Sequence, residues 1–112
     1  MLITSIILFA VAAVIGVTLI TSLLKEKPIS KPAAIFHGLF AATALIILII
    51  FSLNSETGSP WLSVILFAAA ALGGLFLFIR DLNNKPGPKA LALIHAGAAV
   101  LAFLILLVFT FS

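Results

Sequence analysis

Two histidines are the residues of this sequence whose type and spacing best suit chemistry. His37 and His95 each lie in a long apolar stretch, and each stands six residues after a lysine, Lys31 or Lys89. An ionisable side chain inside an apolar span is costly and indicates a functional site by default, although neutral imidazole is the least costly such group. A matched pair at one depth predicts two imidazoles that converge on one ligand.

Axial ligation of one b-type haem is the most specific interpretation of this pair. Haem iron can be held by axial imidazoles, and helical bundles commonly hold cofactors between facing helices. Small side chains beside the histidines leave room for a macrocycle, aromatic ones pack on its edges, and lysines meet its propionates: Gly38, Ala41, Ala99, Phe36, Phe40, Lys31 and Lys89. The pattern resembles the bis-histidine helix pairs of membrane b-type cytochromes, which implies two protein ligands and electron transfer.

A purely structural role for the histidines is the main alternative. Each imidazole can donate a hydrogen bond to a backbone carbonyl or hydroxyl of a neighbouring helix, worth about 0.6–2 kcal/mol in a membrane. Another ligand or metal is also open. Zinc suits the pair poorly, because zinc usually takes four ligands and no thiolate or carboxylate accompanies the histidines.

Two further classes of function stay open, a small transporter with a histidine proton relay and a structural accessory subunit. The size resembles that of small multidrug transporters, but these use an intramembrane Glu, and no apolar stretch contains one. We expect no hydrolytic or transferase enzyme, because no Ser/His/Asp set, paired carboxylates or nucleotide motif is present. The lack of cysteine excludes disulfides and iron–sulfur clusters.

The elements that must position the histidines are membrane-spanning helices. The chain is 64% hydrophobic and 8% charged, whereas soluble domains are about 45–50% apolar and about 25% charged. Four apolar runs, 2–24, 33–53, 61–79 and 90–111, each approach the roughly 20 residues that cross a bilayer as a helix. The sequence predicts an all-α integral membrane protein, one domain over 1–112, folded as an up-down-up-down bundle. Ser30 and Ser59 are the expected helix caps.

The chain also matches itself when residue 59 is placed against residue 1. This offset of 58 positions aligns 1–54 with 59–112 as two tandem helical-hairpin repeats, and sets Lys27-Pro28 against Lys85-Pro86. Repeats of equal topology predict a pseudo-two-fold axis along the membrane normal.

The second and fourth helices of the two repeats share identical residues at a spacing of 3, 4, 3, 4, 3, which is typical of a packing seam. We therefore expect those two helices to touch. The seam residues are Ala34, His37, Ala41, Ala44, Leu48 and Phe51, which match Ala92, His95, Ala99, Ala102, Leu106 and Phe109.

Orientation follows from the basic side chains, which all lie in two loops, 25–32 and 80–89. The positive-inside rule places these loops in the cytoplasm and both termini outside, and we expect a bacterial inner membrane. The same rule accounts for the net charge of +3 without a nucleic-acid partner. The expected partner is the lipid bilayer, and the apolar surface is also compatible with a homodimer or a larger membrane complex.

Overall fold

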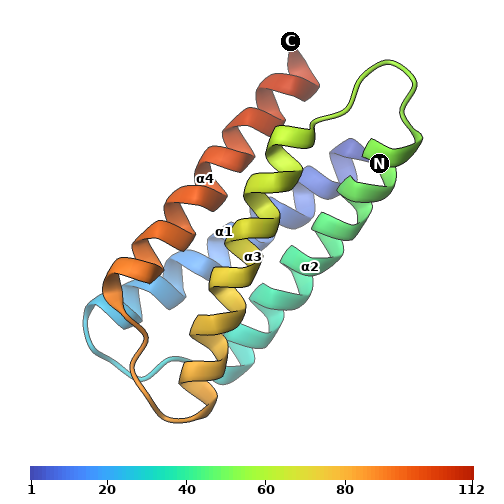
Figure 1. Cartoon of the computed structure of the whole chain (residues 1–112). Coiled ribbons are helices and arrows are strands. Elements are labelled where there is room, and N and C mark those ends of the chain that lie inside the picture. Colours follow the sequence, from blue (N-terminus) through green and yellow to red (C-terminus); the bar gives the residue numbers. More distant parts are fainter.

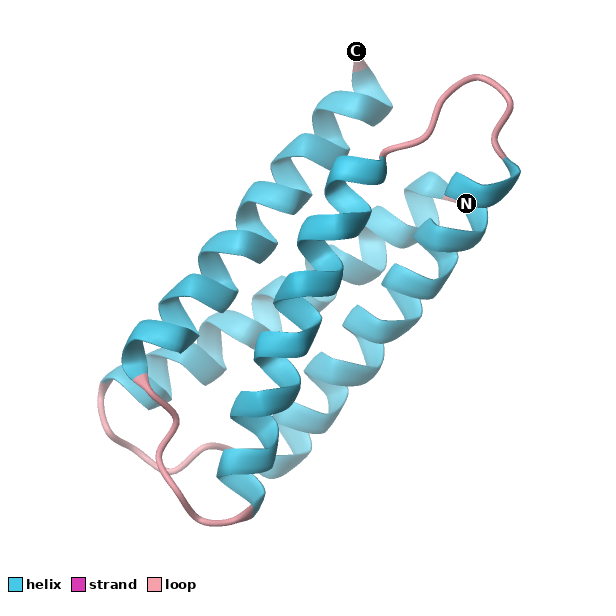
Figure 2. Ribbon diagram, viewed as in Figure 1, coloured by secondary structure: helices cyan, strands magenta, loops and turns pink.

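The computed structural model describes all residues, 1–112, as four antiparallel helices (Figure 1, Figure 2). They are α1 (Leu2–Leu24), α2 (Lys31–Asn54), α3 (Trp61–Leu82) and α4 (Lys89–Phe111). All four are long and apolar enough to cross a membrane. The predicted all-α, four-helix membrane architecture is therefore confirmed.

Helix ends follow local chemistry. The Ser30 hydroxyl accepts a hydrogen bond from the Ala33 amide at 3.3 Å, and Pro32 occupies the first turn, so α2 begins at Lys31. The expected Ser59 cap is wrong. Its hydroxyl donates to the Ser52 carbonyl at 2.7 Å instead, and Pro60 precedes the helix without a side-chain cap.

The four helices form a square in which sequence neighbours lie side by side. α1 packs closely on α2 and α3 on α4, and smaller contacts join α1 to α4 and α2 to α3. The backbones of the diagonal pairs stay apart. The expectation that α2 and α4 pack directly on each other is therefore wrong, and these two helices approach each other only through side chains that reach the bundle centre. Most of their seam residues are still buried or partly buried, and Leu48 and Leu106 are fully buried, whereas Phe109 near the end of α4 is 38% exposed.

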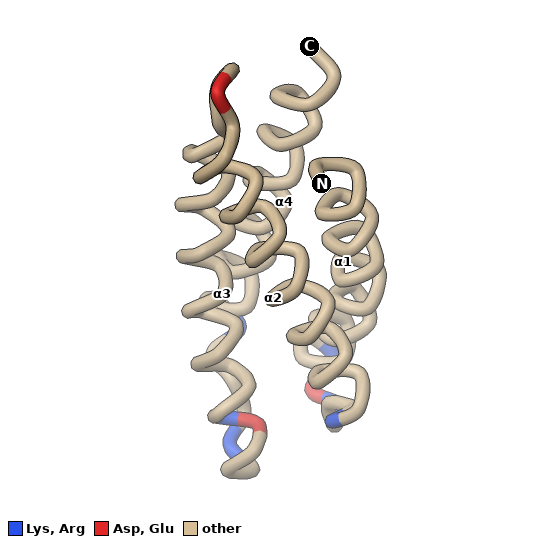
Figure 3. Tube along the Cα trace, turned by 90° about the vertical axis from the view of Figure 1, so that its right-hand side faces the viewer, with Lys and Arg blue, Asp and Glu red and all other residues tan.

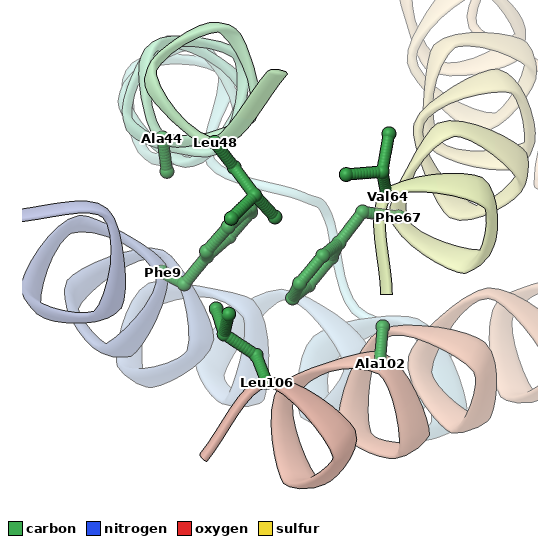
Figure 4. Packing of buried hydrophobic residues seen from close by; sticks show 7 residues of the cluster. All are labelled: Phe9, Ala44, Leu48, Val64, Phe67, Ala102 and Leu106. Carbon is green, nitrogen blue, oxygen red and sulfur yellow. The ribbon is translucent and has the colours of Figure 1, made fainter. Parts of the chain in front are cut away.

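A compact apolar core fills the half of the bundle near the chain termini (Figure 4). The rings of Phe9 and Phe67 stack with centroids 3.7 Å apart and planes 4° apart. Leu48 and Leu106 approach this stack from the two other helices. Elsewhere burial is sparse, with 14 of 112 residues buried, because most apolar side chains point outward, where lipid is the suitable solvent.

The loops within the two hairpins, 25–30 and 83–88, both lie at the opposite end of the bundle (Figure 3). This end, the basic end, carries all six basic residues: Lys25, Lys27, Lys31, Arg80, Lys85 and Lys89. Both termini and the loop containing Glu56 lie at the other end. The basic residues, which are confined to two segments of the sequence, are therefore also confined to one end of the folded bundle.

Candidate cofactor site between the two hairpins

The two imidazoles meet across the bundle although their helices are diagonal. The ring centroids of His37 on α2 and His95 on α4 are 6.2 Å apart, with planes at 79°. Both side chains are half-buried. The diagonal placement explains this geometry, because it separates the two backbones while turning the same face of each helix inward.

Each imidazole is fixed by the first helix of its own hairpin. His37 Nδ1 lies 2.7 Å from the Ala12 carbonyl oxygen, and His95 Nδ1 lies 2.6 Å from the Ala70 carbonyl oxygen. A carbonyl only accepts, so Nδ1 carries the proton and donates it, which leaves Nε2 of the neutral ring with its lone pair. Neither Nε2 atom has a hydrogen-bond partner in the protein. The arrangement is the usual one for a metal-ligating histidine oriented by its other nitrogen.

Glycine makes this close approach feasible. Gly16 stands one turn after Ala12, and a Cβ at Gly16 would lie 3.0 Å from Cε1 of His37. The equivalent Cβ at Gly74, one turn after Ala70, would lie 2.8 Å from Cε1 of His95. Each histidine ring therefore lies against bare backbone, where only glycine leaves the required space.

A cavity of about 1220 Å³ contains both imidazoles. All four helices line it, and it extends from the Phe9–Phe67 stack to the loops of the basic end. Its volume exceeds the roughly 300–1,000 Å³ usual for small-molecule sites. The two histidines and the small and basic residues that the sequence assigned to the site line it: His37, His95, Gly38, Ala41, Ala99, Lys31 and Lys89.

The aromatic part of the sequence-based site needs correction. Phe36 and Phe40 do not line the cavity, and Phe36 is 55% exposed on the outer surface. The aromatic side chains that do line it come from all helices except α2: Phe9, Phe67, Phe78 and Phe103. The sequence reasoning chose neighbours of His37 in the chain, and these fall on the other face of the helix.

Two ion pairs join the hairpins at the mouth of the cavity. Lys31 Nζ lies 3.6 Å from Asp81 Oδ2, and Lys89 Nζ lies 3.2 Å from Glu26 Oε1. Each lysine begins the second helix of one hairpin, and each carboxylate belongs to the other hairpin. Such exposed pairs contribute only about 0–1 kcal/mol each. The two lysines expected to meet propionates therefore already have carboxylate partners.

Sequence reasoning missed the alanine carbonyls and the glycines that orient the rings. Backbone acceptors leave no trace in residue type, so Ala12 and Ala70 were not detectable as such. Gly16 and Gly74 did carry a signal, because they coincide at the offset of 58 that aligns the histidines.

Comparison with known proteins gives no relative for this chain: no protein family, no curated protein and no solved structure matches it. Function must therefore be argued from the geometry of the site.

Proposed function

We propose that the protein binds one b-type haem between His37 and His95 and transfers electrons within the membrane. The observation that carries the proposal is the pair of imidazoles that line one cavity with centroids 6.2 Å apart, Nδ1 engaged and Nε2 free. Haem iron takes its remaining two ligands from the protein along one axis. Two convergent nitrogen ligands are what such an iron requires.

The separation of the rings supports axial ligation. A metal–imidazole bond is about 2.0–2.1 Å long, and the ring centre lies about 1.1 Å behind the nitrogen, so opposed imidazoles on one metal have centroids about 6 Å apart. The centroids of His37 and His95 are 6.2 Å apart. The spacing therefore suits a single metal atom between the two rings.

The ligand set favours haem over a bare metal ion. No group of three or more His, Cys, Asp or Glu side chains gathers anywhere in the chain. A structural zinc ion takes four protein ligands, whereas a porphyrin brings four nitrogens of its own. The small residues Gly38, Ala41 and Ala99 line the same cavity as the histidines, which leaves room for a broad flat ligand.

Electron transfer is the activity that two imidazole ligands favour. A haem held by His37 and His95 would supply one-electron exchange. The protein's own contribution is to hold both rings in a fixed tautomer and orientation. One pair of histidines holds one haem, so the chain is suited to exchange electrons with a partner rather than to carry them across the bilayer alone.

The transport alternative has less support. The cavity ends at the Phe9–Phe67 stack, and beyond it the apolar core fills the bundle. Along the bundle axis, a solute or proton that reaches the histidines from the basic end would therefore next meet packed apolar side chains.

The test is an absorption spectrum of the protein purified in detergent, oxidised and then reduced with dithionite. We expect a Soret band with sharp reduced α and β bands, lost in His37→Ala and in His95→Ala. Thr43→Ala is the matched control, because that hydroxyl bonds only the Leu39 carbonyl of its own helix at 2.8 Å. A colourless wild-type protein that takes up no added haem would refute the proposal, and co-purification of a partner unaffected by the histidine variants would favour an accessory subunit.

A further inference from the structure

We propose that Lys27 and Lys85 bind the carboxylate groups of the ligand that occupies the cavity. For the identity of that ligand the inference rests on the proposed function, under which the carboxylates are the two haem propionates. Charge recognition by the two lysines is a separate property and is testable without iron.

The backbone at both lysines is fixed in the same way. After α1, Glu26 adopts φ 57°, its amide bonds the Leu23 carbonyl at 3.1 Å, and the Lys27 amide bonds the Ser22 carbonyl at 2.9 Å. This pattern is a Schellman motif, which satisfies the last carbonyls of a helix.

The end of α3 repeats the motif. Asn84 adopts φ 57°, its amide bonds the Asp81 carbonyl at 3.0 Å, and the Lys85 amide bonds the Arg80 carbonyl at 3.0 Å. Lys27 and Lys85 thus occupy the same position in two equivalent turns, one in each hairpin.

Lys27 and Lys85 differ from the neighbouring lysines in having no carboxylate partner. Lys27, Lys31, Lys85 and Lys89 all line the cavity. Lys31 and Lys89 are paired with carboxylates, while Lys27 and Lys85 take part in no ion pair. The unpaired cations at the mouth are therefore available to an anionic ligand, and the paired ones brace the two hairpins.

The orientation of a flat ligand between the two imidazoles fits the binding of its carboxylates by Lys27 and Lys85. The line between the two imidazoles crosses the bundle from α2 to α4, so a flat ligand held between them stands along the bundle axis with one edge facing the basic end. His37 is six residues into α2 from Lys31, a rise of about 9 Å. A carboxylate at that edge lies near the mouth, where ammonium groups compensate for its lost hydration.

The experiment compares acids with esters. We would measure binding of haem and of haem dimethyl ester, whose propionates are neutral, to the full chain in detergent at low salt. The variants are wild type, Lys27→Gln/Lys85→Gln and Lys25→Gln; Lys25 belongs to the same loop as Lys27 but does not line the cavity. Wild type and Lys25→Gln should bind the acid about tenfold or more tightly than the ester, as charged hydrogen bonds imply. Lys27→Gln/Lys85→Gln should bind both alike, and Lys27→Arg/Lys85→Arg should restore the preference.

Metal-free protoporphyrin and its dimethyl ester, followed by fluorescence, separate the two proposals. If the wild type binds the porphyrin acid preferentially but takes up no haem, ligation fails and the lysine site stands. If haem binds and the double glutamine variant keeps the full acid preference, the lysine site is wrong and the haem proposal stands. Equal binding of acid and ester by the wild type, with the lysines changing only association with phosphatidylglycerol vesicles, assigns them to the lipid surface and overturns the inference.

Discussion

The imidazole of His95 occupies the space that a side chain at Gly74 would fill, since a Cβ there would stand 2.8 Å from Cε1 of the ring. Gly16 and His37 repeat the relationship at 3.0 Å. In both hairpins the ring is held between the glycine and the carbonyl one turn earlier. The position of each imidazole therefore depends on a residue that lacks a side chain in the neighbouring helix.

Gly74→Ala should displace the His95 ring and weaken haem binding, with Gly16→Ala acting in the same direction but less strongly. Overpacking a tight contact costs about 1–3 kcal/mol, which is roughly a tenfold or greater loss of affinity. Titration with haem followed at the Soret band measures it. Gly97→Ala is the control, because no atom lies within 4 Å of that Cβ; equal behaviour of the three variants would show that the glycines do not shape the site.

If the protein binds haem as proposed, replacing either histidine by methionine should raise the redox potential of that haem. His/Met ligation gives more positive potentials than ligation by two imidazoles. Optical redox titration of His37→Met and His95→Met should show a midpoint shifted to more positive values in both. If both variants keep haem at the wild-type potential, the histidines are not the axial ligands.

The Phe9–Phe67 stack should dominate the stability of the half of the bundle near the termini. Phe9→Ala and Phe67→Ala each remove a buried ring, a change that costs about 3–5 kcal/mol in a packed core. Unfolding in mixed detergent and SDS micelles, followed by circular dichroism, measures the loss. Phe111→Ala should be nearly neutral because that side chain is 69% exposed, and comparable losses in all three variants would argue against a localised core.

Topology is testable by cysteine labelling, since the chain has no cysteine of its own. The basic loops should face the cytoplasm. Ser55→Cys should therefore react with a membrane-impermeant maleimide added outside intact cells, whereas Asn83→Cys should react only after the membrane is opened. The reverse pattern would invert the orientation and place the mouth of the cavity outside.

Local signals made the fold predictable from the sequence. Four apolar runs broken by prolines and charges specify four spans, and Ser30 followed by Pro32 specifies the start of α2. The α2–α4 relationship was not predictable in the same way. Identities between the repeats indicate which face of each helix turns inward. In a square of four helices every inward face meets both adjacent and diagonal helices, so these identities do not show whether α2 and α4 are adjacent or diagonal.

The sequence identified side chains that the fold brings together, but not the backbone groups that orient them. The two histidines and five of their small and basic neighbours line one cavity, whereas Phe36 and Phe40 do not, and the cofactor assigned to this group stays a prediction. The partners of the imidazoles are carbonyl oxygens, which every residue has, so no residue type identifies them. The duplication stays a prediction about ancestry, whereas the contacts that recur at the offset of 58 are properties of the fold.

Each hairpin contains a complete half of the site: an imidazole, the carbonyl that orients it and the glycine against which it lies. Both histidine hydrogen bonds are internal to a hairpin, and no hydrogen bond of the segment between the hairpins involves a histidine. Cutting the chain in that segment would leave both half-sites whole. We therefore expect residues 1–54 and 59–112 to reassemble when they are produced as two polypeptides. Both hairpins line the cavity, so neither polypeptide alone would contain it.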